Sequence, residues 1–261
     1  MNLLMRELSE SRRAKWAWAL GLVAAVLLYL PFYPSVGGSE MMETYLRMFS
    51  PEVARLFGLD MMGSGAGYAQ ATYFGLMGFV LLAIAATGWG SRSVAGAEAS
   101  GALELTVAHA VTRWQVVLEA VLALLVRVGV LSLAGSVTIW ALNGPAQLNL
   151  RIGNLAAVTT ALFLLASVVG AAALLGGAVS GRPGVSTATG AFVAVAAYAA
   201  NGLAGLAGVP WLARLSPFYW AFGQDPLSSG WHAGGLLTLL AAFTLLVLAS
   251  GWALARRDLG T

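Results

Sequence analysis

Residues 91–113 read SRSVAGAEASGALELTVAHAVTR, a polar stretch between two long apolar runs. Within it, Leu103, Val107 and the pair Ala110/Val111 recur at the spacing of one helical face. We therefore predict a short amphipathic helix here that lies against one face of a membrane. The charged residues of the stretch are Arg92, Glu98, Glu104 and Arg113.

The polar stretch ends in a signal for a new helix. Thr112 and Gln115 stand three residues apart, which is the spacing of a capping box. In that motif the threonine hydroxyl and the glutamine side chain satisfy backbone groups at the first turn. We expect a long helix to begin here and to move together with the polar stretch.

The composition decides the class of protein. Hydrophobic residues make up 59% of the 261 and charged residues only 10%, so the polar side chains are too few to cover a soluble globule. The absence of cysteine excludes disulfides and thiolate chemistry. A net charge of +3 from dispersed basic residues argues against binding of nucleic acid.

Six apolar runs are long enough to cross a hydrocarbon core of about 30 Å as helices. They predict an all-α polytopic membrane protein with one domain over residues 1–261. The first run exceeds the ~7–15 apolar residues of a signal peptide, so we retain it as a span. The six spans are expected at about residues 16–34, 68–90, 114–142, 152–180, 185–208 and 233–255.

Six spans put both termini on the same side of the membrane. Nine basic residues then fall on the side of the termini and four on the other, which predicts cytoplasmic termini. The nine are Arg6, Arg12, Arg13, Lys15, Arg92, Arg113, Arg182, Arg256 and Arg257, and the four are Arg47, Arg55, Arg151 and Arg214.

The segments between the spans carry signals of their own. Residues 1–15 have the pattern of a helix lying in the membrane interface, with a solvated tail as the alternative. Residues 35–67 are expected to lie along the opposite surface. Three prolines forbid one long helix in residues 210–231, whose apolar and aromatic side chains predict a compact cap on the outer side, either re-entrant or on the surface. Residues 181–184, Gly-Arg-Pro-Gly, predict a turn.

Glu119 and Arg127 are the ionisable residues inside the apolar runs, and both lie on the third run. An intramembrane charge suggests a functional site. The alternative is that Arg127 extends to the cytoplasmic interface and that Glu119 lies close to that interface. The lack of charge in the other five runs argues against an ion-coupled carrier.

The usual nucleotide-binding motif is missing from the chain. A P-loop needs Gly-x-x-x-x-Gly-Lys-Ser/Thr, and the one lysine, Lys15, has no glycine ahead of it in that register. We therefore expect no cofactor and no enzymatic activity in this chain. If ATP drives transport, another polypeptide must bind and hydrolyse it.

Residues 94–105, VAGAEASGALEL, followed by Val111-Thr112-Arg113, resemble the cytoplasmic segment of ABC-2 type permeases, the membrane subunits of ATP-binding-cassette exporters. In that family the segment reads Ala-Gly-Glu-Glu, Gly-Thr-Leu-Glu-Leu-Leu and Val-Ser/Thr-Arg. Residues 215–219, LSPFY, and the tail 256–259, RRDL, are also similar to the family. The chain departs from the pattern at Ala97, Ala102 and Glu119.

The resemblance implies a permease in the cell membrane that acts as a dimer on two cytoplasmic ATPases, which bind ATP and Mg²⁺. Such proteins export drugs, antibiotics, lipids or polysaccharides, and an apolar path suits a lipophilic or amphipathic substrate. The resemblance leaves open whether the second permease is a copy of this chain.

Two groups of functional residues follow from the resemblance together with the sequence pattern. The polar stretch is expected to dock on the ATPase through Glu98, Gly101, Leu103, Glu104, Val107 and Arg113. The translocation path is expected to include Tyr73, Phe74, Phe79, Tyr198 and Asn201, for which ordinary packing or lipid contact is the alternative.

Three other functions were weighed. A secondary carrier or channel would not need an ATPase, but the nearly uncharged spans argue against it. A membrane-embedded enzyme would need clustered catalytic side chains, and the spans lack such a cluster. A non-transporting assembly or sensory subunit is compatible with the same sequence.

Overall fold

The computed structural model describes residues 12–36, 62–101, 112–207 and 209–257. Regular structure in these residues is helical throughout, with no strand. Six of the helices are long and apolar enough to cross a membrane, which confirms the predicted all-α fold with six spans. They are Lys15–Ser35, Gly65–Ala99, Arg113–Leu142, Ile152–Ser180, Pro183–Gly205 and Ala233–Arg256.

The first two spans are each built from several helical pieces in sequence. Span 1 consists of α2 (Arg12–Tyr29), a 3₁₀ turn η1 (Leu30–Phe32) that contains Pro31, and α3 (Tyr33–Val36). Span 2 alternates α-helical and π-helical stretches: α6 (Gly65–Ala69), η3 (Gln70–Met77), α7 (Gly78–Ser91), η4 (Arg92–Gly96) and α8 (Ala97–Ala99).

The other four spans are single helices. They are α10 (Arg113–Leu142), α11 (Ile152–Ser180), α12 (Pro183–Ala207) and α16 (Ala233–Arg256). As predicted, residues 210–231 form no long helix, because a proline begins each of three short ones: α13 (Pro210–Arg214), α14 (Pro217–Phe222) and α15 (Pro226–Ser229).

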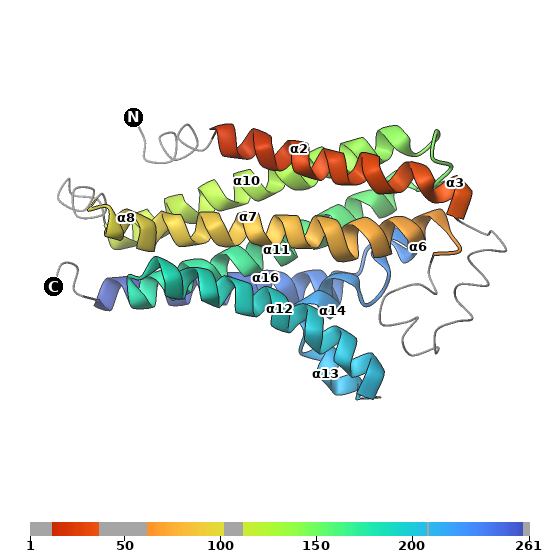
Figure 1. Cartoon of the computed structure of the whole chain (residues 1–261). Coiled ribbons are helices and arrows are strands. Elements are labelled where there is room, and N and C mark those ends of the chain that lie inside the picture. Colours follow the sequence, from red (N-terminus) through yellow and green to blue (C-terminus); the bar gives the residue numbers. More distant parts are fainter. Residues whose placement is uncertain (1–11, 37–61, 102–111, 208, 258–261) are drawn as a thin grey trace.

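The spans alternate in direction, so the bundle has two ends (Figure 1). We call the end at which α2 begins and α16 ends the near end, and the other the far end. The ends of α8 and α11 also lie at the near end, whereas α13, α14 and α15 lie toward the far end. In Figure 1 the far half of α12 leans out from the bundle together with α13.

Span 2 extends further than the sequence suggested. The predicted span ended near residue 90, but the helix continues to Ala99 through the first half of the polar stretch. Its serines are buried rather than solvated: Ser93 donates to the carbonyl of Trp89 (2.8 Å) and Ser91 to that of Pro183 (3.1 Å). Because these hydroxyls find backbone acceptors, the helix can stay packed against its neighbours.

Helix α11 is the centre of the bundle and packs against α7, α10, α12 and α16. Small residues let the backbones approach closely: a Cβ atom added to Gly90 of α7 would overlap the carbonyl oxygen of Gly170 on α11. Nearby on α11, the carbonyl of Ala173 accepts from the hydroxyl of Ser186 on α12 (2.6 Å). Small residues and hydroxyls of this kind are typical of helix contacts in membranes.

The contact between Gly90 and Gly170 predicts a stability difference between two neighbouring alanine variants. Gly90→Ala should lower the midpoint of thermal unfolding, because the new methyl group forces two backbones apart at an overpacking cost of about 1–3 kcal/mol. Gly88→Ala is the matched control, since a Cβ there meets no atom within 4 Å. Replacing that helical glycine should leave stability unchanged or raise it by about 0.5–1 kcal/mol. Equal midpoints for the two variants in detergent-purified protein would contradict the close approach.

Candidate functional site

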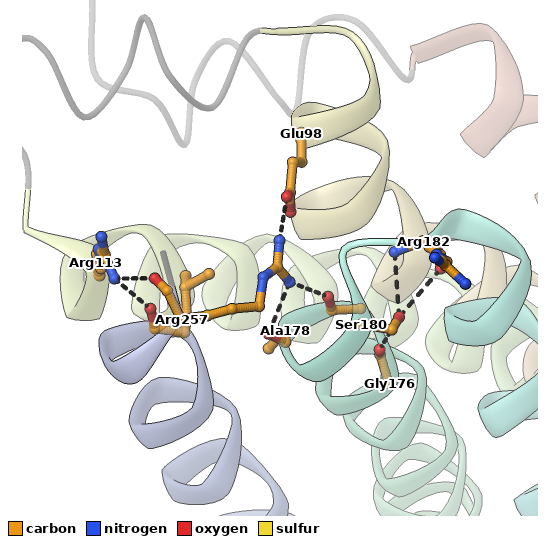
Figure 2. Close-up of polar contacts among 9 residues, drawn as sticks. Glu98, Arg113, Gly176, Ala178, Ser180, Arg182 and Arg257 are labelled. Carbon is orange, nitrogen blue, oxygen red and sulfur yellow. Dashed lines mark hydrogen bonds and ion pairs between the residues drawn. The ribbon is translucent and has the colours of Figure 1, made fainter. Parts of the chain in front are cut away.

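Four helix ends meet at the near end, close to Glu98 and Arg113 of the polar stretch (Figure 2). They are the end of α8, the start of α10, the end of α11 and the end of α16. Three charged side chains connect them, and we call the group Glu98, Arg113 and Arg257 the near-end clasp.

Arg113 connects the start of α10 to the end of α16. Its Nη1 atom donates to the backbone carbonyls of Leu254 (2.9 Å), Ala255 (3.1 Å) and Arg257. The last carbonyls of a helix have no partner within it and carry a partial negative charge. A guanidinium group at this position supplies N–H donors to these carbonyls and a positive charge opposite their partial negative charge. The start of α10 is thereby joined to the end of α16.

Arg257 connects the tail to two further parts of the chain, α11 and α8. Its Nη1 atom donates to the carbonyls of Ala178 (3.0 Å) and Gly177 (3.3 Å), in the last turns of α11. Its Nη2 atom forms an ion pair with Oε1 of Glu98 on α8. The two side chains are 21% and 22% exposed, so solvent screens this pair less than a fully exposed one.

Residues 102–111 lie outside the described residues, and with them the predicted coupling residues Leu103, Glu104 and Val107 and the predicted amphipathic helix. The structure does describe the residues on both sides. Gly101 has a left-handed φ of 73°, which favours glycine, and its N–H donates to the carbonyl of Glu98 (2.9 Å). On the other side the predicted capping box is confirmed: Thr112 Oγ1 accepts from Gln115 N–H (3.2 Å), and Gln115 Oε1 accepts from Thr112 N–H (2.8 Å).

Gly181 makes room for the ion pair of the clasp. It ends α11 with a φ of 66°, which favours glycine. A Cβ atom at this position would overlap Nη2 of Arg257 and lie 2.8 Å from Oε1 of Glu98. The turn predicted at residues 181–184 is therefore confirmed, and its glycine serves both the backbone and the clasp.

The five residues predicted for the translocation path fall into two groups. Phe79 of α7 and Tyr198 of α12 both pack edge-on against Phe218 of α14, with ring centroids 5.4 Å and 5.2 Å away. Sequence analysis had placed Phe218 in the outer cap and had not connected it to the path. Its position between spans 2 and 5 depends on how α14 folds back, which no local pattern reveals.

The other group does not join that cluster. Tyr73 and Phe74 are buried in span 2 and contact each other at 5.1 Å between ring centroids. The Tyr73 hydroxyl lies directly over Gly135 of α10. Asn201 is half-buried on α12, one turn beyond Tyr198. Whether these side chains line a path stays a prediction.

Sequence analysis missed a polar connection at the far end. Gln70, 4% exposed in span 2, donates from Nε2 to Oδ1 of Asp225 (3.0 Å) and accepts from the N–H of Leu227 (3.0 Å). Asn154 of α11 donates to the carbonyls of Leu227 (3.0 Å) and Ser228 (2.9 Å). A lone amide side chain in an apolar run could have signalled such a contact, because amides bond across helices in membranes.

The two intramembrane charges on α10 are placed differently from each other. Arg127 is 5% exposed, and its guanidinium carbon lies 5.7 Å from the ring centroid of Trp89 on α7. It therefore ends inside the bundle against an aromatic face, which contradicts the alternative that Arg127 extends to the interface. Glu119 is half-buried, two turns nearer the near end.

The clasp predicts that Gly181 tolerates no side chain. Gly181→Ala and Gly181→Asn should both lower the midpoint of thermal unfolding, because each adds a Cβ where the Glu98–Arg257 pair lies. Asparagine adopts left-handed backbone readily, whereas alanine there costs about 1–2 kcal/mol, so the pair of variants separates steric conflict from backbone strain. Gly184→Ala, whose Cβ would meet no atom within 4 Å, is the control. A fully stable Gly181→Asn variant would show that the clasp does not need the space.

Comparison with known proteins agrees with this architecture. A family model described as ABC-2 family transporter protein matches residues 1–221, which is most of the chain and includes five of the six spans. No curated protein matches the chain. The matched region contains Glu98 and Arg113, and it ends before Arg257. With six membrane-spanning helices and a family match over most of its length, the chain is a multi-pass membrane protein that belongs to the ABC-2 transporter family.

Proposed function

We propose that this chain is the permease subunit of an exporter in the cell membrane, and that separate cytoplasmic ATPases drive it. Membership of the family makes it a transmembrane permease of an ATP-binding-cassette transporter. The observation that carries the rest of the proposal is the near-end clasp. The clasp connects the residues on both sides of residues 102–111 to the ends of α11 and α16. Such connections are required if residues 102–111 transmit force to the spans.

The proposal assigns the near end to the cytoplasm. Among the described residues, the basic ones gather at this end, and the far end holds Arg151 and Arg214. An excess of arginine and lysine marks cytoplasmic connections of membrane proteins. The near-end residues are Arg12, Arg13, Lys15, Arg92, Arg113, Arg182, Arg256 and Arg257.

ATP hydrolysis is assigned to the partner. The sequence lacks the Gly-x-x-x-x-Gly-Lys-Ser/Thr motif that would cradle the phosphates, and its single lysine is Lys15. ATP and Mg²⁺ would bind to the ATPase, and this chain would supply the path and the docking surface. A second permease, either a copy of this chain or a relative, would complete the assembly.

The substrate class proposed is lipophilic or amphipathic. The aromatic cluster of Phe79, Tyr198 and Phe218 joins spans 2 and 5 through α14. Aromatic and apolar walls with few polar groups favour ligands with large apolar surfaces. Asn201, one turn away on α12, would supply a polar contact.

Purification of the tagged permease from its native membranes tests the proposal. An ATPase of the ATP-binding-cassette class should co-purify, and the complex should hydrolyse ATP in a vanadate-sensitive manner. Deletion of that ATPase should abolish export from intact cells. Transport that continues without the ATPase would identify a secondary carrier or channel instead.

Glu104→Lys tests the docking role of residues 102–111. We expect it to weaken co-purification of the ATPase or export, while insertion and thermal stability stay unchanged, because a charge at a water-exposed docking surface contributes only about 0–1 kcal/mol to folding. Glu119→Gln, on α10 rather than in the docking segment, is the comparison variant. If Glu104→Lys binds the ATPase and exports normally, docking must rest on the apolar residues Leu103 and Val107.

A further inference from the structure

We infer that the face where α10 meets α16 at the near end binds the headgroup of an anionic phospholipid. Three exposed side chains form this face: Trp114 at the start of α10, and Trp252 and Arg256 in the last turns of α16. We call these three residues the lipid face. Binding of this kind requires only that the chain lies in a membrane, and neither an ATPase nor a direction of transport.

The start of α10 and the end of α16 lie against each other. The ring of Trp114 covers Gly251 so closely that a Cβ atom added to that glycine would overlap it. Beside this contact, Nη1 of Arg113 donates to the carbonyl of Leu254 (2.9 Å). Because Trp252 follows Gly251 in the sequence, both tryptophans lie close to the contact between the two helices.

The lipid face continues a stripe of exposed apolar side chains on α16. Leu245, Leu248 and Trp252 are all exposed, on a helix that is long and apolar enough to cross a membrane. In a bilayer such a stripe borders on lipid. Tryptophan is enriched at the depth of the headgroups, so Trp252 near the end of the span marks that depth. Arg256, one turn further along the helix, lies at the level of the lipid phosphates.

The polar groups of the lipid face have no acceptor in the part of the chain that the structure describes. The guanidinium carbon of Arg256 lies 4.1 Å from the ring centroid of Trp252, and an aromatic ring attracts a cation without offering it an oxygen. The indole N–H groups of Trp114 and Trp252 also bond to none of the described residues. By contrast, the indole N–H of Trp220 donates to the carbonyl of Arg214 (2.6 Å). Three donor groups therefore remain available to a ligand.

The charge of Arg256 is not balanced by a carboxylate among the described residues. Its neighbours Arg113 and Arg257 donate to carbonyls at helix ends, and Arg257 also forms the ion pair of the clasp. Glu119 is on α10, but it comes five residues after Trp114 and so projects about 140° around the helix from it. The lipid face is therefore cationic and complementary to an anionic headgroup.

An anionic phospholipid fits these donors. Its phosphate offers several oxygens to a planar guanidinium group, which can bind phosphate through two parallel N–H bonds. The neighbouring ester oxygens can accept from the indole N–H groups, and the acyl chains can lie along the exposed leucines of α16. A zwitterionic lipid carries its own cation beside the phosphate. Arg256 should therefore favour the anionic lipid about fivefold, the factor that corresponds to ~1 kcal/mol per basic residue near a membrane surface.

Native mass spectrometry of the purified full chain tests this site. The permease is titrated with an equimolar mixture of phosphatidylglycerol and phosphatidylcholine, and the ratio of the two in the first bound lipid is measured. Arg256→Gln is the main variant. Arg182→Gln is the matched control, because that arginine is also exposed at the near end but lies over no aromatic ring of the described residues.

We expect the unsubstituted permease to prefer phosphatidylglycerol. Arg256→Gln should lower this preference about fivefold, and Arg182→Gln should leave it unchanged. Trp252→Leu is a second variant, which keeps the arginine but removes the ring beside it. It should lower the preference about two- to fivefold, the size of a cation–π contact at an exposed site. Because all three side chains are exposed, the variants should unfold at the same temperature as the unsubstituted protein.

Equal losses in Arg256→Gln and Arg182→Gln would overturn the inference, since they would indicate attraction by the overall charge of the near end. An unchanged preference in Arg256→Gln would overturn it as well. Displacement of the bound lipid by soluble glycerol phosphate would show that the face recognises a phosphate and not a lipid. A dimer that separates in the Arg256→Gln variant would show that a second permease covers this face instead.

Discussion

Close backbone contact around α11 is the constraint on which the rest of the structure depends. In a bilayer, apolar side chains gain little by leaving lipid for protein, so helices associate through tight packing and internal hydrogen bonds. Gly90 and Gly170 bring α7 and α11 together, and Ser186 fastens α12 to α11 through a backbone carbonyl. Because these backbones lie close to one another, the ends of the helices come within reach of a single arginine side chain.

The polar side chains are concentrated where the backbone needs partners. Helix ends leave carbonyls without hydrogen bonds, and burying them near a membrane without a donor is costly. Arg113 and Arg257 meet this need at the ends of α16 and α11. At the far end, Asn154 donates to the carbonyl of Leu227 in α15, and the amide oxygen of Gln70 accepts from the N–H of the same residue. The same bonds that satisfy the backbone also join the ends of different spans.

Span 2, like α11, takes part in both sets of contacts. Glu98, near one of its ends, binds the tail, and Gln70, toward the other, binds the segment between spans 5 and 6. Between them lie Phe79, which packs on α14, and Trp89, which covers Arg127. Two π-helical stretches interrupt this span, and such wide turns often occur at functional positions. Span 2 is therefore bonded to other parts of the chain near both of its ends.

The sequence by itself determined the class of protein, the six spans, the capping box at Thr112, the turn at Gly181 and the division of residues 210–231 into short helices. Each of these depends only on residues close together in the sequence: the length of an apolar run, a cap formed within four residues, or a proline that lacks an N–H. The tertiary structure alone decided the pairing of Glu98 with Arg257, 159 positions apart, and of Gln70 with Asp225, 155 positions apart. It also decided that span 2 continues to Ala99, where Ser91 finds its acceptor on the neighbouring helix α12. A side chain's partner across such distances depends on how the spans pack, and no spacing within one segment contains that information.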